Sequence, residues 1–182
     1  MKSIAVYCGA SFGASPAYAD AARELARVLV EHNIGLVYGG GKVGLMGVIA
    51  DEVLRLGGEA TGVIPRALVE REVGHAGLTR LFVVKDMHER KAMMSDLSDG
   101  FIAMPGGMGT LEELFEMLTW SQLGIHAKPV GLLNVGGFYD GLVSFVAHLH
   151  GEGFVRAEHA ALLMVESGAD ALVQRLQSGL PR

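Results

Sequence analysis

The sequence predicts an α/β fold: a doubly wound, Rossmann-like and mainly parallel sheet of about seven strands, with helices on both faces. Short apolar runs rich in Val and Ile alternate with longer helical patterns along nearly the whole chain. Regular alternation of this kind is typical of parallel sheets with right-handed crossovers. The apolar runs also lack in-out alternation, as expected for strands that helices cover on both faces.

The individual elements follow from these patterns in chain order. Strands are predicted at residues 3–8, 34–38, 59–64, 79–84, 100–104, 129–135 and 161–165, and helices at residues 16–32, 44–56, 86–97, 110–123, 139–150 and 168–177. Asp86 with Glu89 has the spacing of a capping box at the third helix. The polar segment 66–77, broken by two glycines, is predicted to form a lid or a short helix beside a site. No Pro- or Ser-rich linker divides the chain, so residues 1–182 are expected to form a single domain.

The composition excludes several classes of protein. Half of the 182 residues are hydrophobic, which excludes intrinsic disorder, yet no apolar stretch approaches the roughly 20 residues that span a bilayer. The N-terminus has too short an apolar segment for a secretory signal. The lone Cys8 excludes an internal disulfide framework and is typical of a reducing cytosol, so a cytoplasmic protein is expected. A net charge of −5 without a basic stripe argues against a nucleic-acid partner.

The first candidate site loop follows the first strand. In this class of sheet, ligands bind beyond the carboxyl ends of the strands, and the loops after the first, second and fifth strands are glycine-rich. Gly9-Ala10-Ser11-Phe12-Gly13 satisfies the G-x-S-x-G pattern of serine hydrolases. Because no later His lies in an obvious site loop, a nucleophilic serine is disfavoured. A tight turn that presents the Ser11 hydroxyl to the crevice is the better interpretation.

The second candidate loop carries Gly39, Gly41 and Gly44, which fit G-x-G-x-x-G ahead of a helix. The next strand lacks the acidic residue that a dinucleotide fingerprint needs, and Lys42 is not followed by the Ser or Thr of a Walker A loop. Two interpretations stay open. Either Gly40, Gly41 and Gly44 contact a nucleotide, or the glycines only allow close packing of the helix on the sheet.

The loop after the fifth strand is the most informative. It reads Pro105-Gly106-Gly107-Met108-Gly109-Thr110-Leu111-Glu112-Glu113 and opens a helix. Its backbone N–H groups and the Thr110 hydroxyl fit a phosphate monoester, with no lysine required. Glu113 has two open interpretations: it completes a capping box with Thr110 as the N-cap, or it is catalytic.

Arg90 and Lys91 lie on the predicted helix 86–97, whose first turn is expected to border the same crevice. Successive helical residues are about 100° apart, so the two side chains cannot both point squarely at one target. A solvated basic patch is the usual explanation of such a pair. Glu72 alone is an ordinary surface acid. The seven histidines are scattered without metal-ligand spacing, so no metal is expected.

Together these motifs carry a resemblance to a known family. Residues 105–113 match P-G-G-x-G-T-x-x-E, and upstream lie Arg90-Lys91, Tyr38-Gly39-Gly40-Gly41 and Gly44-Leu45-Met46-Gly47. Over most of its length the chain resembles the LOG (Lonely Guy) family of cytokinin riboside 5′-monophosphate phosphoribohydrolases, many once labelled lysine decarboxylases. Met108 departs from the plant members, which commonly carry tyrosine there; the change leaves the phosphate nest intact and alters the wall beside it.

The resemblance implies a site and a reaction. Substrate contacts would fall on Glu72, Arg90, Lys91, Gly106, Gly107, Met108, Gly109, Thr110, Leu111, Glu112 and Thr119, and the catalytic pair on Arg90 and Glu113. The implied reaction hydrolyses the N-glycosidic bond of adenosine 5′-monophosphate, or of an N6-modified derivative, to free base and ribose 5-phosphate without a cofactor. Glu113 would stabilise the positive charge on the ribose and activate water, while Arg90 would assist the leaving base or orient the sugar.

Two other classes of function stay open. A non-catalytic nucleotide-binding module would use the same loops for a phosphate ligand. A decarboxylase would need pyridoxal phosphate on a lysine. Only Lys42, Lys85 and Lys91 lie near the predicted crevice, and no acidic partner for the cofactor ring is evident.

The predicted helix 110–123 also suggests self-association. Phe115, Met117 and Trp120 are spread around much of its circumference, and a helix that is apolar on several sides is buried more widely than one sheet face requires. With the family resemblance, this predicts a homodimer whose interface lies near the active site.

Overall fold

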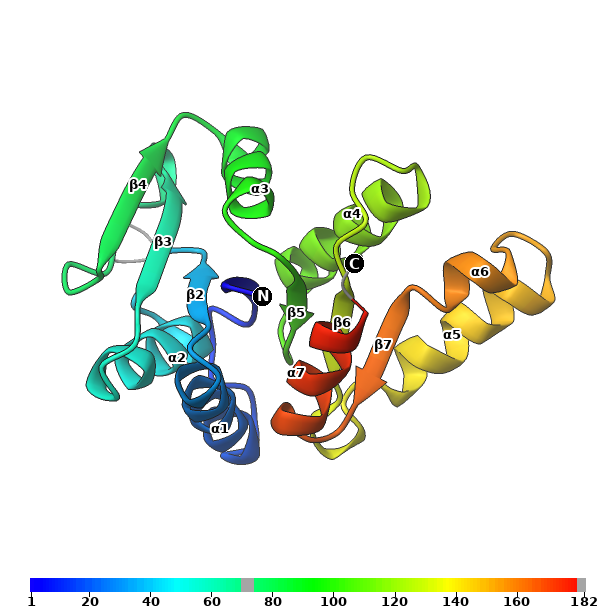
Figure 1. The fold of residues 1–182 in the computed structure, drawn as a ribbon, viewed down its shortest axis with the longest axis horizontal. Coiled ribbons are helices and arrows are strands. Elements are labelled where there is room, and N and C mark those ends of the chain that lie inside the picture. Colours follow the sequence, from blue (N-terminus) through cyan, green and yellow to red (C-terminus); the bar gives the residue numbers. More distant parts are fainter. Residues whose placement is uncertain (70–73, 180–182) are drawn as a thin grey trace.

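The structure, a computed structural model, describes residues 1–69 and 74–179 (Figure 1) and confirms the predicted fold class. Within these residues, seven parallel strands form one sheet in the order β4-β3-β2-β1-β5-β6-β7. The strands are β1 (Ser3–Tyr7), β2 (Gly35–Tyr38), β3 (Ala60–Pro65), β4 (Arg80–Val84), β5 (Phe101–Ala103), β6 (Val130–Leu133) and β7 (Leu163–Glu166). Each coincides with a predicted apolar run, and the ends differ by at most two residues.

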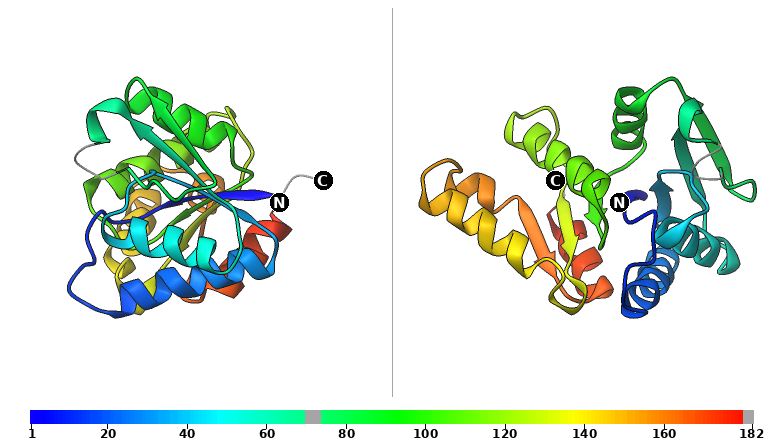
Figure 2. Two further views of the ribbon diagram at one scale, coloured as in Figure 1. Left: turned by 90° about the vertical axis from the view of Figure 1, so that its left-hand side faces the viewer. Right: turned by 180° about the vertical axis from the view of Figure 1, so that it is seen from behind.

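Helices cover both faces of the sheet, as predicted. One layer holds α1 (Ala17–Glu31), α2 (Gly44–Arg55) and α7 (Ala169–Ser178), and the other holds α3 (Met87–Asp96), α4 (Met108–Gln122) and α5 (Asp140–Gly151). The left-hand view of Figure 2 shows the strands between α1 and α2 on one side and α3 and α4 on the other. The short α6 (Ala157–Ala160) was not predicted, because one turn of helix carries no apolar period.

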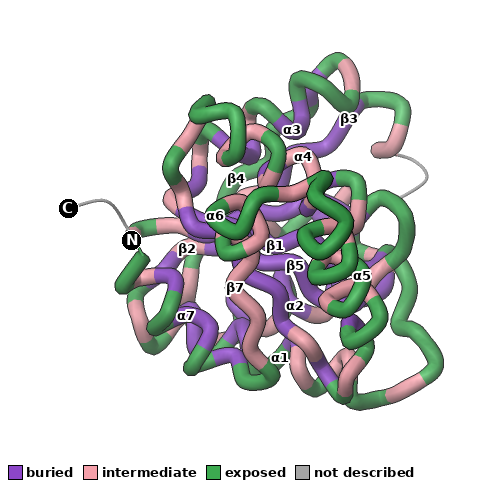
Figure 3. The backbone as a smooth tube through the Cα atoms, turned by 90° about the vertical axis from the view of Figure 1, so that its right-hand side faces the viewer, coloured by how far each residue is buried: buried purple, intermediate pink, exposed green. Residues whose placement is uncertain are grey.

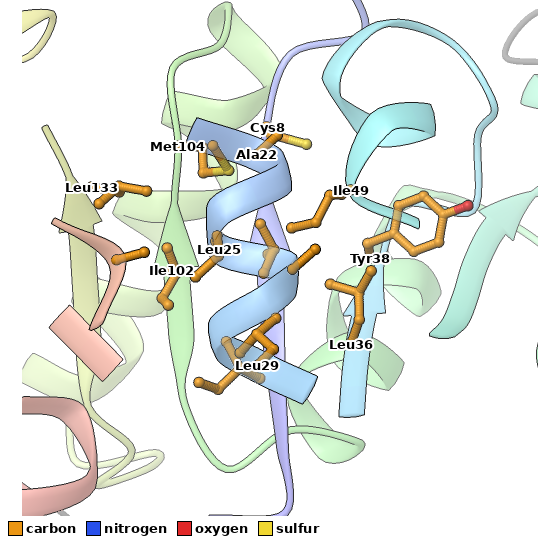
Figure 4. Close-up of a cluster of buried hydrophobic side chains, with 14 of the residues drawn as sticks. Cys8, Ala22, Leu25, Leu29, Leu36, Tyr38, Ile49, Ile102, Met104 and Leu133 are labelled. Carbon is orange, nitrogen blue, oxygen red and sulfur yellow. The ribbon is translucent and has the colours of Figure 1, made fainter. Parts of the chain in front are cut away.

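Alternate residues of each strand face the two layers. In β1, Ile4 and Val6 belong to the cluster with α1 and α2, while Ala5 and Tyr7 belong to the cluster with α4. Figure 4 shows the first cluster, in which Leu25 of α1 lies over the strands. Buried backbone is concentrated in the strands at the centre of the molecule (Figure 3). Burial on both faces explains why the central strands β1, β2, β5 and β6 are mostly apolar.

The strand order reverses at β1, which has β2 on one side and β5 on the other. Such a switch point separates the loops that follow the two central strands and opens a crevice at their carboxyl ends. Here the loops after β1 and β5 run side by side, and the Gly9 N–H donates to the Pro105 carbonyl at 3.1 Å. The Leu45 N–H also donates to the Gly9 carbonyl at 3.0 Å, so the fold brings together all three glycine-rich loops.

The segment between β3 and β4 is only partly described. A 3-10 helix at Arg66–Leu68 confirms the short helix expected there, and residues 70–73 lie outside the described part of the chain. Gly74 then pairs with Gly41 in an isolated antiparallel bridge. Over residues 1–69 and 74–179, no helix has the length and apolar character needed to cross a membrane.

Gly44 offers a direct test of how the loops are held. Its φ is +56°, and an added Cβ would lie 2.3 Å from the backbone of Ala10 and Ser11. Gly44→Ala is therefore expected to lower the free energy of unfolding by about 2–4 kcal/mol, through backbone strain and overpacking. Urea denaturation followed by circular dichroism measures the change.

Gly141→Ala is the matched control, since Gly141 lies within α5 and an added Cβ would meet nothing within 4 Å. This control is expected to keep or raise the stability by up to about 1 kcal/mol. Equal stabilities for the two variants would show that the contact between the loops after β1 and β2 is not tight.

Candidate active site

A cavity of about 440 Å³ lies at the switch point, beyond the carboxyl ends of β1 and β5. Its walls come from the loops after these two strands, from the first turns of α3 and α4, and from apolar side chains across the opening. The lining residues are Cys8, Gly9, Ala10, Ser11, Phe12, Gly13, Tyr18, Leu45, Met46, Leu68, Met87, Arg90, Pro105, Gly106, Gly107, Gly109, Thr110, Glu113 and Phe138. One side of the cavity is thus polar and glycine-rich, and the rest is mostly aliphatic and aromatic.

The polar side is the start of α4. A Cβ on Gly106 would lie 2.1 Å from Thr110 Oγ1 and 2.9 Å from the Gly9 nitrogen, so only glycine allows the two loops and the helix to approach this closely. The helix begins at Met108 after the extended Gly107, which makes no side-chain cap. The first N–H groups of α4 therefore lack a capping side chain and adjoin the cavity. A helix start of this kind favours an anion.

This start corrects one interpretation of the sequence. Thr110 is not the N-cap of α4 but lies inside its first turn, because glycines at 106 and 107 let the chain turn earlier. Glu113 consequently forms no capping box with Thr110. At the preceding helix, the predicted cap at Asp86 is confirmed: its carboxylate accepts from the N–H groups of His88 and Glu89 at 3.0 Å.

Glu113 instead meets Arg90. The Arg90 Nη2 lies 3.5 Å from Glu113 Oε1, and the two residues are only 5% and 6% exposed. Gly39 makes room for the guanidinium, because a Cβ there would lie 2.2 Å from Arg90 Nη2. The expectation of a solvated basic patch is therefore wrong for Arg90. Its charge is buried against a carboxylate at the floor of the cavity.

Lys91 is buried as well, but it faces a different place. Its ammonium pairs with Glu112 and lies 3.1 Å from Glu116 Oε2, both on α4, and Lys91 does not line the cavity. Burial by itself lowers the pKa of the ammonium, but the hydrogen bonds to these two carboxylates outweigh it and leave the pKa above its ordinary value. Consecutive Arg90 and Lys91 thus serve two separate sites on α4, in agreement with their angular separation.

The remaining predicted residues divide into three groups. The first group lines the cavity and consists of Ser11, Gly106, Gly107, Gly109 and Thr110. The second group does not line it and consists of Met108, Leu111, Glu112 and Thr119. Thr119 is exposed and donates to the Phe115 carbonyl at 2.7 Å. Glu72 lies outside the described residues.

The glycines after β2 make close packing contacts. A Cβ on Gly40 would press on Leu81 and Ile64 at 3.1 and 3.2 Å, and the Gly41 carbonyl accepts from the Tyr38 hydroxyl at 3.1 Å. Gly44 packs against the loop after β1. None of these three glycines is among the described residues that line the cavity.

The apolar wall was missed by sequence reasoning. Phe12 and Phe138 are 58% and 43% exposed, and the Phe138 ring meets the Tyr18 ring edge-on at 5.6 Å. Met87 completes this side at the start of α3. Phe12 lies within the G-x-S-x-G match, and Met87 follows the Asp86 cap. Their closeness in sequence to the predicted site residues could have identified them as part of the cavity wall.

Comparisons with known proteins give a family match and close relatives. Residues 46–176 match the family model described as "Possible lysine decarboxylase". The chain is 49% identical over 181 residues to a cytokinin riboside 5′-monophosphate phosphoribohydrolase of Arabidopsis thaliana, covering 100% of this chain and 85% of that protein. It is 48% identical over 180 residues to one of Oryza sativa subsp. japonica, covering 99% and 74%.

Solved structures share the fold at lower identity. A molybdenum cofactor binding protein from Rippkaea orientalis aligns with a TM-score of 0.72 at 21% identity, covering 97% of this chain and 95% of that one. A Moco carrier protein from Chlamydomonas reinhardtii aligns with a TM-score of 0.71 at 22% identity, covering 98% of each chain. At this level of identity the likeness concerns the fold.

The reactivity of Cys8 tests the environment of the cavity floor. Burial raises the pKa of the Cys8 thiol, and the negative charge of Glu113 acts in the same direction. The thiolate is the reactive form, so alkylation by iodoacetamide at pH 8 is expected to be at least about tenfold slower in the folded protein than in the chain unfolded in guanidinium. Because Cys8 is the single cysteine, mass spectrometry reads one site. Similar rates in both states would mean that the thiol is accessible and readily ionised.

Proposed function

The chain belongs to the family of cytokinin riboside 5′-monophosphate phosphoribohydrolases, and we propose from this and from its cavity that it hydrolyses the N-glycosidic bond of adenosine 5′-monophosphate or an N6-modified derivative. The products are the free base and ribose 5-phosphate. The observation that carries the proposal is the buried Arg90–Glu113 pair beside the glycine-rich start of α4. A phosphate site and a carboxylate one helical turn apart suit a phosphorylated sugar whose anomeric carbon is to be attacked.

Binding begins with the phosphate. In the proposal, the N–H groups of residues 106–110 and the Thr110 hydroxyl hold the phosphate at the positive end of α4. Glu113 lies one turn further along the same helix. The apolar wall of Phe12, Met87 and Phe138 suits a flat, weakly polar nucleobase.

The chemical step breaks the C1′–N9 bond. Its electron pair leaves with the purine, and positive charge develops on the ribose. The Glu113 carboxylate stabilises that charge and takes a proton from the water whose oxygen attacks C1′. The departing purine takes up a proton from solvent and becomes the neutral free base, and Glu113 returns its proton to solvent. Arg90 stays protonated, so it acts by charge and by hydrogen bonding, either to the leaving base or to the sugar and Glu113.

The residues of the cavity do not favour decarboxylation. Pyridoxal phosphate chemistry needs a lysine that can form a Schiff base, and no lysine is present among the described residues that line the cavity. Lys42 and Lys85 are exposed, and Lys91 is paired with carboxylates on α4. Lysine decarboxylation is therefore not proposed.

The proposal also includes the domain organisation, location and assembly of the protein. We take residues 1–182 as a single cytoplasmic domain that needs no cofactor and binds no nucleic acid, consistent with one cysteine and a net charge of −5. A homodimer is supported by the layer of α3, α4 and α5. None of the residues of α5, all of which the structure describes, is buried, and Leu123 and Ile125 after α4 are 67% and 62% exposed (Figure 3).

Product analysis over a panel of nucleotides tests the activity. Adenosine 5′-monophosphate and N6-prenylated adenosine 5′-monophosphate are expected to release free base, and adenosine is expected to react poorly because it lacks the phosphate that positions the sugar. Binding of the monophosphates without release of any base would instead identify a non-catalytic nucleotide-binding module.

Glu113→Gln tests the catalytic carboxylate. Turnover is expected to fall by about 100-fold or more, because the amide can neither accept the proton nor stabilise the positive sugar. Binding of ribose 5-phosphate, measured by calorimetry, is expected to persist. Glu59→Gln is the control, since Glu59 is exposed and pairs with Arg80 at the other end of the sheet. Substantial turnover by Glu113→Gln would remove Glu113 from its role.

Light scattering after size exclusion tests the dimer. The wild-type protein is expected to elute at twice the mass of the chain, and Leu123→Glu to shift it toward the monomer by placing a charge in an apolar interface. Gln174→Glu, on α7 in the opposite layer, adds the same charge and is expected to leave the dimer intact. A monomeric wild-type protein would contradict the proposed assembly.

A further inference from the structure

Lys91 is the second buried cation of α3, and its surroundings differ from those of Arg90. The Lys91 side chain is 7% exposed and contacts carboxylates of α4, outside the cavity. Arg90 and Lys91 are adjacent on α3, and their partners Glu113, Glu112 and Glu116 lie within a little more than one turn of α4. Three ion pairs of the described residues therefore join the two helices, and of these the Arg90–Glu113 pair lines the cavity.

The carboxylates of α4 differ in how far solvent screens their charge, and so in how strongly the Lys91 ammonium stabilises them. The Glu112 side chain is 52% exposed, so water screens its charge. The Glu116 side chain is 22% exposed and its Oε2 is buried. Glu113 and Glu116 are three residues apart on one helix, where like charges repel each other. Glu116 is thus the carboxylate that depends most on the Lys91 ammonium.

Tyr7 lies among the same charges but cannot replace Lys91. Burial raises the pKa of its hydroxyl, and the charges of Glu113 and Glu116 raise it further, while Arg90 acts in the opposite direction. The hydroxyl stays neutral at physiological pH, and it has no hydrogen-bond partner among the described residues. Within the described part of the chain, the ion pairs seen for these carboxylates are made by Arg90 and Lys91.

We propose that Lys91 is a positioning residue for the catalytic pair: by neutralising Glu112 and Glu116, it leaves the Arg90 guanidinium to Glu113. This assignment rests on the proposed function, in which Arg90 and Glu113 act on the substrate. Without the Lys91 charge, Glu116 competes with Glu113 for Arg90, and the pair at the cavity floor is drawn out of place. Small displacements of a catalytic group reduce turnover more than binding.

A direct substrate contact by Lys91 predicts different kinetics. A lysine that holds the phosphate or sugar contributes to binding, so its loss raises KM, and removing the charge of Glu116 does not compensate. A positioning role predicts a loss in kcat that the removal of the Glu116 charge reverses. The two roles are separated by comparing single and double variants.

The experiment measures kcat and KM for Lys91→Met, Glu116→Gln and the double variant on the best monophosphate substrate. Lys91→Met is expected to lower kcat by about tenfold or more with KM within about threefold. The double variant is expected to regain a kcat within about threefold of Glu116→Gln alone. A raised KM with kcat preserved, or a double variant no faster than Lys91→Met, would overturn the assignment.

Two controls keep the outcomes distinct. If Lys91→Met does not fold by circular dichroism, the double variant and Glu116→Gln are compared instead; equal kcat values support the positioning role and a slower double variant overturns it. The wild-type protein is assayed first. Failure of the wild type to release base overturns the proposed function itself, whereas an active wild type with the wrong pattern of variants overturns only the role of Lys91.

Discussion

The buried ion pair between Arg90 and Glu113 is the interaction to which the rest of the site is fitted. Removing two charges from water is costly, and a lone buried charge costs more, so each of these residues needs the other. The surrounding chain accommodates the pair. Gly39 leaves space for the guanidinium, the cap at Asp86 fixes the start of α3, and the early start of α4 at Met108 sets the helical position of Glu113.

The topology explains why the pair lies in a cavity. Reversal of the strand order at β1 leaves the loops after β1 and β5 side by side at one edge of the sheet. The same edge receives the first turns of α3 and α4. The main-chain groups proposed to bind the phosphate and the carboxylate proposed to be catalytic consequently lie at the start of one helix. Their separation is then set by helical geometry rather than by a mobile loop.

Much of the fold could be predicted because both faces of the sheet are covered. Each strand contains a short apolar run, and the helices α1 to α5 lie in the intervals between strands. The surroundings of Arg90 and Lys91 could not be predicted in the same way. The carboxylates that pair with these two cations lie about twenty residues later, on α4. The packing of α3 against α4 brings the cations and the carboxylates together. The start of α4 was misplaced because Thr110 and Glu113 imitate a capping box, while the glycines before them allow an earlier turn.

In the proposed complex, a phosphate at the start of α4 places the anomeric carbon of the bound nucleotide beside residue 113. A crystal structure of the Glu113→Gln protein with adenosine 5′-monophosphate measures this relation directly. We expect phosphate oxygens within hydrogen-bond distance of the main-chain nitrogens of residues 106–110, and C1′ within about 3–4 Å of the residue-113 side chain. A nucleotide bound with its phosphate elsewhere, or with C1′ facing away from that side chain, would contradict the proposed complex.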